Sequence, residues 1–453
     1  MRHHRSIVRA ALLGLSLAAC SGASAPTPEP TPNERAPTPE PPPATDEPAT
    51  DEPTAPPIPV EPTASTTPIP ELDEPQRLAV GRAVNGLAAD LFAPIARAQG
   101  NVTFSPASIE AALAMTAAGA RGATRDEMVR VLHLEGDSDA AIDALGATLR
   151  RWDDPARTTY TLRVANRLFG ERTFTFEEAY LTRVRDVYAA PLEPLDFRGA
   201  ADGSRVHING WVAQHTRDRI RDLLPPRSID ADTRLVLVNA VYLDARWLVP
   251  FERTATRDAP FTTSAGESVS VPTMNRRGSF AVGTVGGATV VELPYQGGDL
   301  AMRFVLPAQG SAPEAWATAA NLSDVAPLTM REIRLALPRF RIEPADPVAL
   351  RQYLEPLGMR AAFQRGAADF TGIAAPPSPD DRLYITEGFH KAFVRVDEEG
   401  TEAAAATAIV MGRVGSAMPQ PVEEIRFDRP FLFVLRDVHT GATLFVGRVS
   451  DPR

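Results

Sequence analysis

The stretch that decides the fold runs from Asp397 to Val410 and reads DEEGTEAAAATAIV. As a β-strand, its side chains would alternate between two faces. From Thr401 onward, one face would carry uncharged side chains that grow in size along the strand, those of Thr401, Ala403, Ala405, Thr407, Ile409 and Met411. Because no proline lies between Gly400 and Ala417, every backbone N–H there can donate to a neighbouring strand. The stretch can therefore be a strand with one small, uncharged face as well as a plain Ala-rich surface helix.

Helical spacing is clear in the chain well before this stretch. Apolar residues recur every four positions and predict two helices, one with Leu87, Leu91 and Ile95 and one with Ile109, Leu113 and Ala117. Ser105-Pro106 suits the start of the second helix. Thr124 and Glu127 have the spacing of a capping box, which predicts that a third helix starts there.

Strand patterns dominate the second part of the chain. Leu235 to Leu243 reads LVLVNAVYL, a nearly unbroken apolar run that suits a strand buried on both faces. Near the end, the apolar runs 431–435 and 442–446 flank Asp437-Val438-His439-Thr440-Gly441, which predicts a hairpin. Helices first and strands later indicate an α+β fold.

The composition divides the chain into a tether and one folded domain. Residues 21–75 hold 18 prolines and 11 acidic residues against a single arginine, with few aliphatic side chains, and such a segment cannot bury a core. We therefore expect a Pro/Thr/Glu-rich disordered tether over 21–75 and one domain over 76–453. The tether accounts for the net charge of -10. The nearly neutral remainder argues against nucleic-acid binding, which needs a concentrated basic surface.

An export signal precedes the tether. Met1–Arg9 is basic, and Ala10–Ala19 is an apolar run too short to span a bilayer. The run ends in Leu17-Ala18-Ala19-Cys20, which resembles a bacterial lipoprotein signal and contains the chain's one cysteine. The resemblance implies a signal peptide over 1–20, acylation of Cys20, and an exported protein tethered by lipid to the cell envelope or cell surface. An ordinary signal peptide with a chance cysteine is the alternative.

Signatures of enzymes are absent from the sequence. It has no G-x-S-x-G, H-E-x-x-H or P-loop motif. The single cysteine excludes an internal disulfide framework. None of the seven histidines pairs with another at a convincing metal-ligand spacing. We therefore expect no catalytic residue, no metal and no cofactor.

In the stretch 397–410, the sequence resembles the serpins, a family of serine protease inhibitors. Its hinge is similar to theirs almost residue for residue, in Glu398, Glu399, Gly400, Thr401, Glu402, Ala403, Ala404, Ala405, Ala406 and Thr407. Further family motifs occur in the family's order over 76–453: NVTFSPASI (101–109), VNAVYL (238–243), LGM (357–359), ADF (368–370), HKAF (390–393), PFLF (430–433) and FVGRV (445–449).

The resemblance implies a serpin fold, with helices followed by large mixed β-sheets and an exposed reactive-centre loop at about 398–422. It also implies an irreversible suicide-substrate inhibitor, monomeric and without a cofactor. A serine endopeptidase would cut the loop, the cut hinge would enter the central sheet, and the acyl-enzyme would remain trapped as a covalent complex. The alternative is a non-inhibitory serpin that acts as a chaperone or ligand carrier. The small inserting face favours inhibition.

The same resemblance implies roles for individual residues. A group that controls sheet opening is expected at Ser105, Ser108, Asn239, Trp247, His390 and Arg339, with Arg339 paired to Glu398. The reactive bond is expected at Arg413-Val414, which suits trypsin-like proteases with a buried pocket carboxylate. The alternative is Val414-Gly415, which suits elastase-like proteases.

Overall fold

The computed structural model describes residues 67–453 apart from 155, 325–327, 377, 379–380 and 402–421, and it gives only the backbone of 164, 165 and 239. The helices are α1 (Glu74–Ile95), α2 (Pro106–Ala118), α3 (Gly122–Val131), α4 (Ser138–Trp152), α5 (Glu178–Tyr188), α6 (Phe197–His215), α7 (Ala319–Leu322) and α8 (Arg351–Leu357), with 3-10 turns η1 (Arg253–Ala255), η2 (Pro313–Trp316) and η3 (Ala361–Phe363). The strands are β1 (Val102–Phe104), β2 (Tyr160–Glu171), β3 (Leu192–Leu195), β4 (Leu235–Arg246), β5 (Arg257–Thr262), β6 (Ser268–Val285), β7 (Ala288–Pro294), β8 (Leu300–Leu306), β9 (Thr329–Pro338), β10 (Phe340–Ile342), β11 (Val348–Ala349), β12 (Phe389–His390), β13 (Val394–Val396), β14 (Gly400–Thr401), β15 (Glu423–Arg426), β16 (Phe431–Asp437) and β17 (Thr443–Val449).

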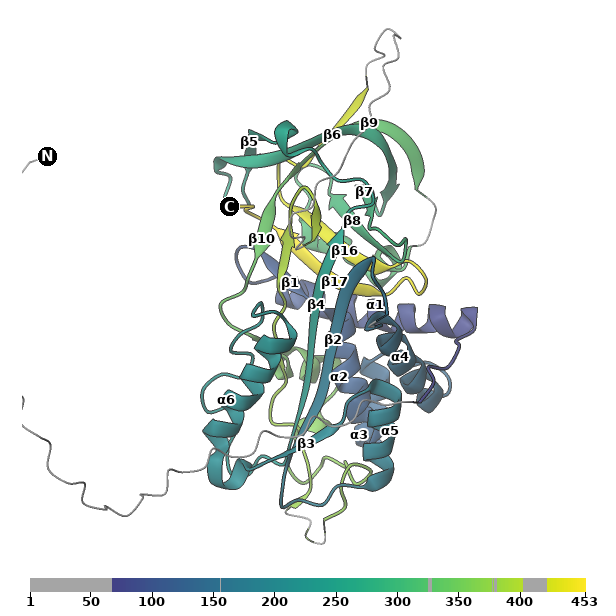
Figure 1. Cartoon of the computed structure of the whole chain (residues 1–453), viewed down its shortest axis with the longest axis vertical. Helices are drawn as coiled ribbons and strands as arrows, with labels where there is room; N and C mark the ends of the chain where they lie inside the picture. Colours follow the sequence, from purple (N-terminus) through teal and green to yellow (C-terminus); the bar gives the residue numbers. More distant parts are fainter. Residues whose placement is uncertain (1–66, 155, 325–327, 377, 379–380, 402–421) are drawn as a thin grey trace, which may run out of the picture. The chain divides into compact units, whose positions relative to one another are not determined.

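A mixed sheet runs along the long axis of the folded part, and it positions the site. Its described strands follow the order β10-β13-β14-β4-β2-β3. The long strands β4 and β2 pair antiparallel over almost their whole length (Figure 1), whereas β3 joins β2 in parallel. We call this six-stranded sheet the central sheet. The short strand β14 contains the start of the predicted hinge and lies between β13 and β4.

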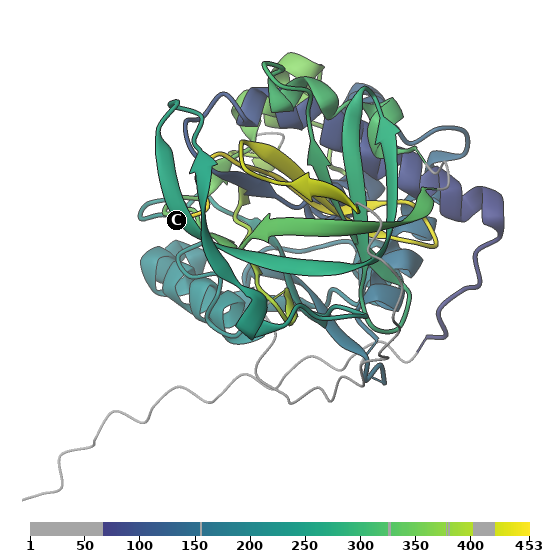
Figure 2. The ribbon, with the colours of Figure 1, turned by 90° about the horizontal axis from the view of Figure 1, so that it is seen from above.

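A second sheet closes one end of the central sheet. Its path is β1-β17-β16-β8-β7-β6-β9-β15, with β5 paired to β6. The hairpin β16-β17 and the long strand β6 provide most of its pairing. Seen from above, β6 and β9 cross the top of the folded part, and α6 lies on the opposite side from α1 (Figure 2).

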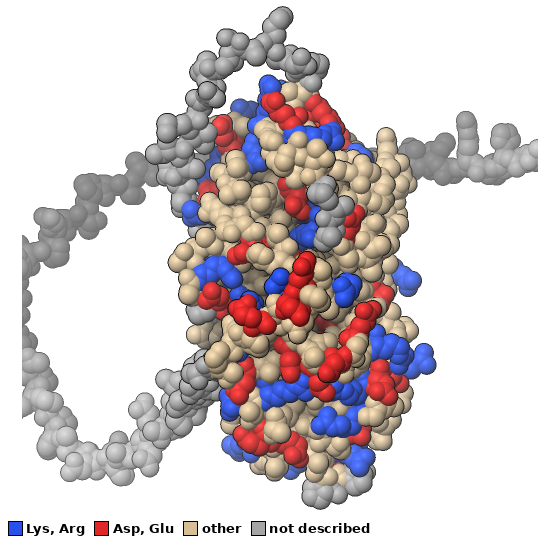
Figure 3. Space-filling view, turned by 90° about the vertical axis from the view of Figure 1, so that its right-hand side faces the viewer, with Lys and Arg blue, Asp and Glu red and all other residues tan. Residues whose placement is uncertain are grey.

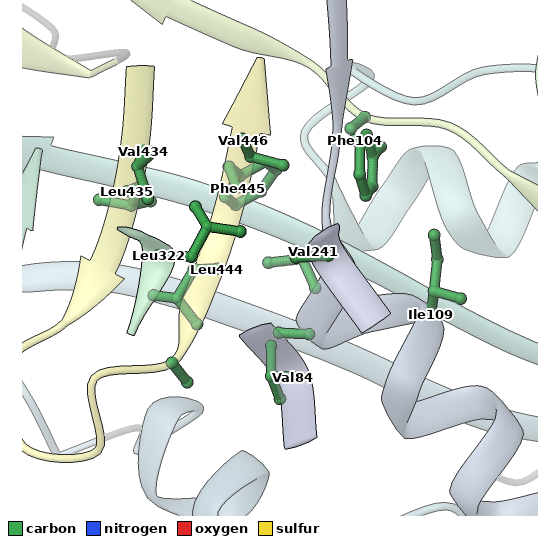
Figure 4. Close-up of a cluster of buried hydrophobic side chains, with 14 of the residues drawn as sticks. Val84, Phe104, Ile109, Val241, Leu322, Val434, Leu435, Leu444, Phe445 and Val446 are labelled. Carbon is green, nitrogen blue, oxygen red and sulfur yellow. The ribbon is translucent and has the colours of Figure 1, made fainter. Parts of the chain in front are cut away.

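Apolar side chains form two separate clusters on the two faces of the central sheet. The main core joins helices α1 and α2 to the inner face, where Val241 of β4 lies near Val84, Ile109 and Leu444 (Figure 4). A smaller cluster packs α6 on the outer face and includes Val238 and Ala240 of β4. The alternation along β4 therefore buries both of its faces, as the apolar run predicted. Helix α1 is long and apolar enough to cross a membrane, but most of it is buried within this core.

Most elements agree with the sequence patterns, and two details differ. Helices α1 and α2, strand β4 and the hairpin β16-β17 all form, and the α+β class is confirmed. However, α1 begins at Glu74, inside the segment assigned to the tether, because Asp73 and Gln76 form a capping box there. The capping box predicted at Thr124 is wrong. That residue lies inside α3, and its hydroxyl accepts a hydrogen bond from the Asp369 N–H at 2.9 Å.

Charges are interspersed on the surface that Figure 3 shows. Arginine and lysine side chains alternate with aspartate and glutamate across this face, without an extended area of one sign. Such a face gives no concentrated positive potential for a polyanion.

Candidate functional site

The hinge begins inside the central sheet. Gly400 lies opposite Arg246 of β4, and Thr401 lies opposite Ala245 and also pairs with Val396 of β13. The approach to β4 is so close that a Cβ atom on Gly400 would lie 2.0 Å from the Ala245 carbonyl oxygen. Only glycine fits such a contact. The conformation therefore explains the glycine of the hinge motif, and it leaves Thr401 buried at 4 % exposure.

Two stacked aromatic side chains hold this entry point. Trp247 and Tyr295 stack with ring centroids 4.4 Å apart, and both are fully buried. The Tyr295 hydroxyl is hydrogen-bonded to Oγ1 of Thr401. Trp247 donates its backbone N–H to the Glu399 carbonyl at 2.8 Å and its indole Nε1–H to the Asp397 carbonyl at 2.9 Å. The pair thus fixes the chain on both sides of Gly400.

Three acidic residues precede Gly400, and each is paired with an arginine from a different element. Glu398 accepts from Nε–H of Arg339 at 2.7 Å and from the Thr256 hydroxyl. Glu399 pairs with Arg253 of η1, and Asp397 lies 3.0 Å from Arg395 of β13. The hinge is therefore anchored at its base by charge.

The Glu398–Arg339 pair is confirmed, but it differs from an exposed surface pair, because the carboxylate is only 3 % exposed. Burial alone would raise the pKa of Glu398, yet the hydrogen bonds from Arg339 and Thr256 outweigh it and hold the pKa below the ordinary value. Removing Arg339 would leave the buried carboxylate without its counter-charge, which costs more than losing an exposed ion pair.

Past Thr401, the edge of β4 that faces β13 stays open among the described residues. There β4 pairs only at Ala245 and Arg246, whereas its other edge pairs with β2 from Leu235 to Ala245. A cavity of about 250 Å³ lies beside the open edge. Its walls come from β4 (235–238), α2, the connection after α6 (223–234) and the segment 381–390. Among the described residues, most of this edge of β4 forms no ladder with another strand, and part of the space beside it is open.

A polar group lies beneath this opening. The Ser105 N–H donates to Nε2 of His390 at 2.9 Å, and the Ser105 hydroxyl accepts from the Ser108 N–H at the start of α2. Burial lowers the pKa of His390 to about 4, so near neutral pH the ring is uncharged and can accept from Ser105. His390 also pairs with Val348 in the β11-β12 ladder. The group therefore links α2 to the strand segment across the cavity from β4.

The predicted sheet-opening residues form two groups. Ser105, Ser108 and His390 are together beneath the opening, whereas Trp247 and Arg339 are at the hinge entry. The side chain of Asn239 is outside the described part of the chain, and its backbone pairs with Asn166 of β2. Other predicted residues also lie outside the described ranges: Cys20, the hinge residues Glu402 to Thr407, and Arg413, Val414 and Gly415 of the reactive bond.

Sequence reasoning missed several residues that touch the hinge. Tyr295, Thr256 and Arg253 are distant from the hinge in sequence and belong to no motif that singles them out. Their role depends on the fold that brings them to the end of β4. A fully buried tyrosine hydroxyl generally has a hydrogen-bond partner, but the burial of Tyr295 is visible only in the fold, so no sequence signal pointed to these residues.

Comparison with known proteins gives a consistent result. The family model described as Serpin (serine protease inhibitor) matches residues 82–452. The leukocyte elastase inhibitor of Bos taurus is 37% identical over 81% of this chain and 97% of its own. An uncharacterized serpin-like protein of Thermococcus kodakarensis is 36% identical over 84% of this chain and 88% of its own. The crystal structure of uncleaved ovalbumin superimposes with a TM-score of 0.71 at 30% identity, covering 83% of this chain and all of ovalbumin.

Proposed function

Because the chain belongs to the serpin family of serine protease inhibitors, we propose that it is an irreversible suicide-substrate inhibitor of serine endopeptidases. In this mechanism a protease cuts the loop after the hinge and forms an acyl-enzyme. The freed hinge then enters the central sheet and carries the protease with it. The observation that supports the proposal is the pairing of the first hinge residues with β4. Gly400 and Thr401 lie opposite Arg246 and Ala245, at the end of β4 where its open edge begins.

The register of the seated residues defines how the rest of the hinge would enter. With Thr401 opposite Ala245, an antiparallel continuation sets residue 403 opposite Leu243 and residue 405 opposite Val241. Both of these β4 side chains face the main core, where there is room only for small partners in a close-packed interior. The alanines at 403 and 405 meet that requirement.

The energetics of insertion are adequate for the mechanism. A ten-residue strand placed between β4 and β13 would form roughly ten backbone hydrogen bonds at about 1 kcal/mol net each. The sum is comparable to the whole stability of a typical domain, about 5–15 kcal/mol. That driving force is large enough to deform a protease covalently attached to the inserting chain.

The hinge composition favours inhibition over the family's non-inhibitory activities. In a chaperone or ligand carrier of this family, the loop would stay outside the sheet. A bulky, charged or proline residue on the inward face would block insertion. This sequence has threonine and alanine at each inward position from 401 to 407. We therefore favour inhibition, with the protein acting as a monomer that needs no cofactor.

The test is incubation of the purified protein with a panel of trypsin-like, elastase-like and subtilisin-like proteases, followed by denaturing gels. We expect a band at the summed size of protease and inhibitor that survives SDS, since the link is an ester. Cleaved loop and fully active protease with every enzyme of the panel would support a non-inhibitory role instead.

We also propose that the inhibitor is exported and anchored to a membrane through lipid on Cys20. The proposal rests on the position of this lone cysteine directly after Leu17-Ala18-Ala19. Two or more acyl chains would give stable anchoring, since each buried CH2 contributes about 0.8 kcal/mol.

Replacement of Cys20 by serine is expected to move the protein from the membrane fraction to the soluble extracytoplasmic fraction, or to block its maturation. Ultracentrifugation and immunoblotting of the two fractions would measure the shift, and Ser21→Ala, one residue away, is the matched control. Unchanged fractionation of the Cys20→Ser protein would contradict the lipid anchor.

A further inference from the structure

Helix α6 lies across the outer face of the central sheet and is hydrogen-bonded to a wall residue of the cavity beside β4. Its packing against the sheet uses a hydrophobic cluster separate from the main core. Asn209 of α6 exchanges two hydrogen bonds with the backbone of Leu224, at 2.8 and 2.9 Å. Leu224 is part of the cavity wall. Helix α6 is therefore tied to the chain segment that forms one wall of this cavity.

One buried carboxylate joins α6 to the sheet. Glu193 of β3 is 4 % exposed, and its carboxylate is hydrogen-bonded to two basic side chains. Arg167 of β2 donates from Nη1 at 2.8 Å, and Nε2 of His207 on α6 lies 2.7 Å from the other carboxylate oxygen. We call these three residues the Glu193 clasp. Two members belong to the sheet and only His207 belongs to the helix, so the His207–Glu193 bond is the one bond of the clasp that joins α6 to the sheet.

Aromatic packing reinforces the clasp from the same face of α6. Trp211, one turn after His207, places its ring 5.0 Å from the Arg167 guanidinium and 5.7 Å from the ring of Phe169. A guanidinium over an indole adds a cation–π attraction. The contact orients Arg167 toward Glu193 and fixes the register of α6 on β2 and β3.

We propose that the Glu193 clasp positions α6 over the central sheet and thereby sets the rate at which the sheet accepts a further strand. The proposal rests on the proposed function, because it concerns the same insertion step. The clasp belongs to β2, β3 and α6, whereas Gly400 and Thr401 pair with β4 and β13, so the clasp acts through α6 and through the Asn209–Leu224 contact. The His207 side chain is 40% exposed, so changing it perturbs the core least.

The test measures insertion directly and needs no protease. A synthetic peptide with the sequence of residues 401–410, TEAAAATAIV, is mixed with the full chain, and its entry is followed by native-gel mobility and by fluorescence of a dye on the peptide. His207→Ala removes the helix side of the clasp. We expect the peptide to anneal about fivefold faster, the fold-change for losing one hydrogen bond of ordinary net strength.

Two further variants make the result specific. His207→Gln restores an N–H donor at nearly the position of Nε2, so its annealing rate should return to within about twofold of the parent, by the hydrogen-bonding capacity of the amide. His133→Ala is the matched control, because His133 also lies 2.8 Å from a carboxylate, that of Asp90, and is also 40% exposed, but it joins other elements. It should leave the rate unchanged.

The outcomes distinguish failure of the clasp proposal from failure of the proposed inhibitory function. If the peptide enters the parent protein but His207→Ala does not accelerate its entry, or His133→Ala accelerates it equally, the clasp proposal is overturned and insertion stands. If the peptide enters none of the proteins, insertion itself is refuted, and the role of the clasp with it.

Discussion

Replacing Thr401 with arginine is expected to turn the inhibitor into a substrate, with inhibition reduced about 100-fold or more. Thr401 is 4 % exposed and is hydrogen-bonded to Tyr295 at the entry to the central sheet. In the uncut protein an arginine at 401 would leave the sheet and keep its guanidinium in water, whereas insertion of the cut hinge would bury that guanidinium without a partner, at a cost of about 3–5 kcal/mol. Insertion would then be too slow to trap the acyl-enzyme, and hydrolysis would release active protease.

The control for this change is Thr401→Ser, which keeps the hydroxyl and the small size. We expect it to inhibit within about threefold of the parent, since buried polar groups tolerate replacement that preserves the hydrogen bond. The measurement is the molar ratio of inhibitor to protease needed for full inhibition, with cleaved inhibitor quantified on denaturing gels. If Thr401→Arg inhibited as well as the parent, entry of the hinge beside β4 would not be part of the mechanism.

Replacing Arg413 with alanine is expected to abolish inhibition of trypsin-like proteases, with the association rate constant reduced about 100-fold or more. Such proteases bind an arginine through charge-assisted hydrogen bonds to a pocket carboxylate, and a pocket built for that contact strongly rejects a side chain that lacks it. Arg413 is the one charged side chain between Glu402 and Glu423, which makes it the natural anchor for this pocket.

Val414→Ala is the matched variant for the alternative cut, after Val414. If the protease cuts after Arg413, this change should affect trypsin-like enzymes by only a few-fold. The two variants are compared against one trypsin-like and one elastase-like enzyme, and the fragment released from the complex is sequenced. A new N-terminus at Val414 is expected. Full inhibition of trypsin-like enzymes by Arg413→Ala, or a new N-terminus at Gly415, would show that the reactive bond is misassigned.

Local sequence patterns predicted those elements in which one physical requirement dominates. The apolar run 235–243 can only be satisfied by a strand buried on both faces, and it forms β4. The turn signal at 437–441 determines the β16-β17 hairpin in the same way. Thr124 and Glu127 show the opposite case. Their spacing fits a helix cap, yet both side chains are hydrogen-bonded to residues distant in sequence. Glu127 accepts hydrogen bonds from the backbone N–H groups of Arg360 and Ala361.

The site was predictable where the hinge motif itself defines it, and less so where residues distant in sequence meet. Gly400 could be recognised from the motif, but the reason for it, contact with the Ala245 carbonyl, depends on the register between β14 and β4. His207 and its partner Glu193 share no motif and meet only when α6 docks on β3, so no sequence pattern pairs them.

The central claim is that a cut in the loop traps the protease as an ester while the hinge enters beside β4, and intact mass spectrometry of the complex tests it most directly. The complex should have the mass of the protease plus the chain up to Arg413, with the fragment from Val414 to Arg453 released under denaturing conditions. It should also lose the protease on hydroxylamine treatment, which cleaves esters. Recovery of the protease unmodified, beside a chain cut at the same bond, would contradict the account.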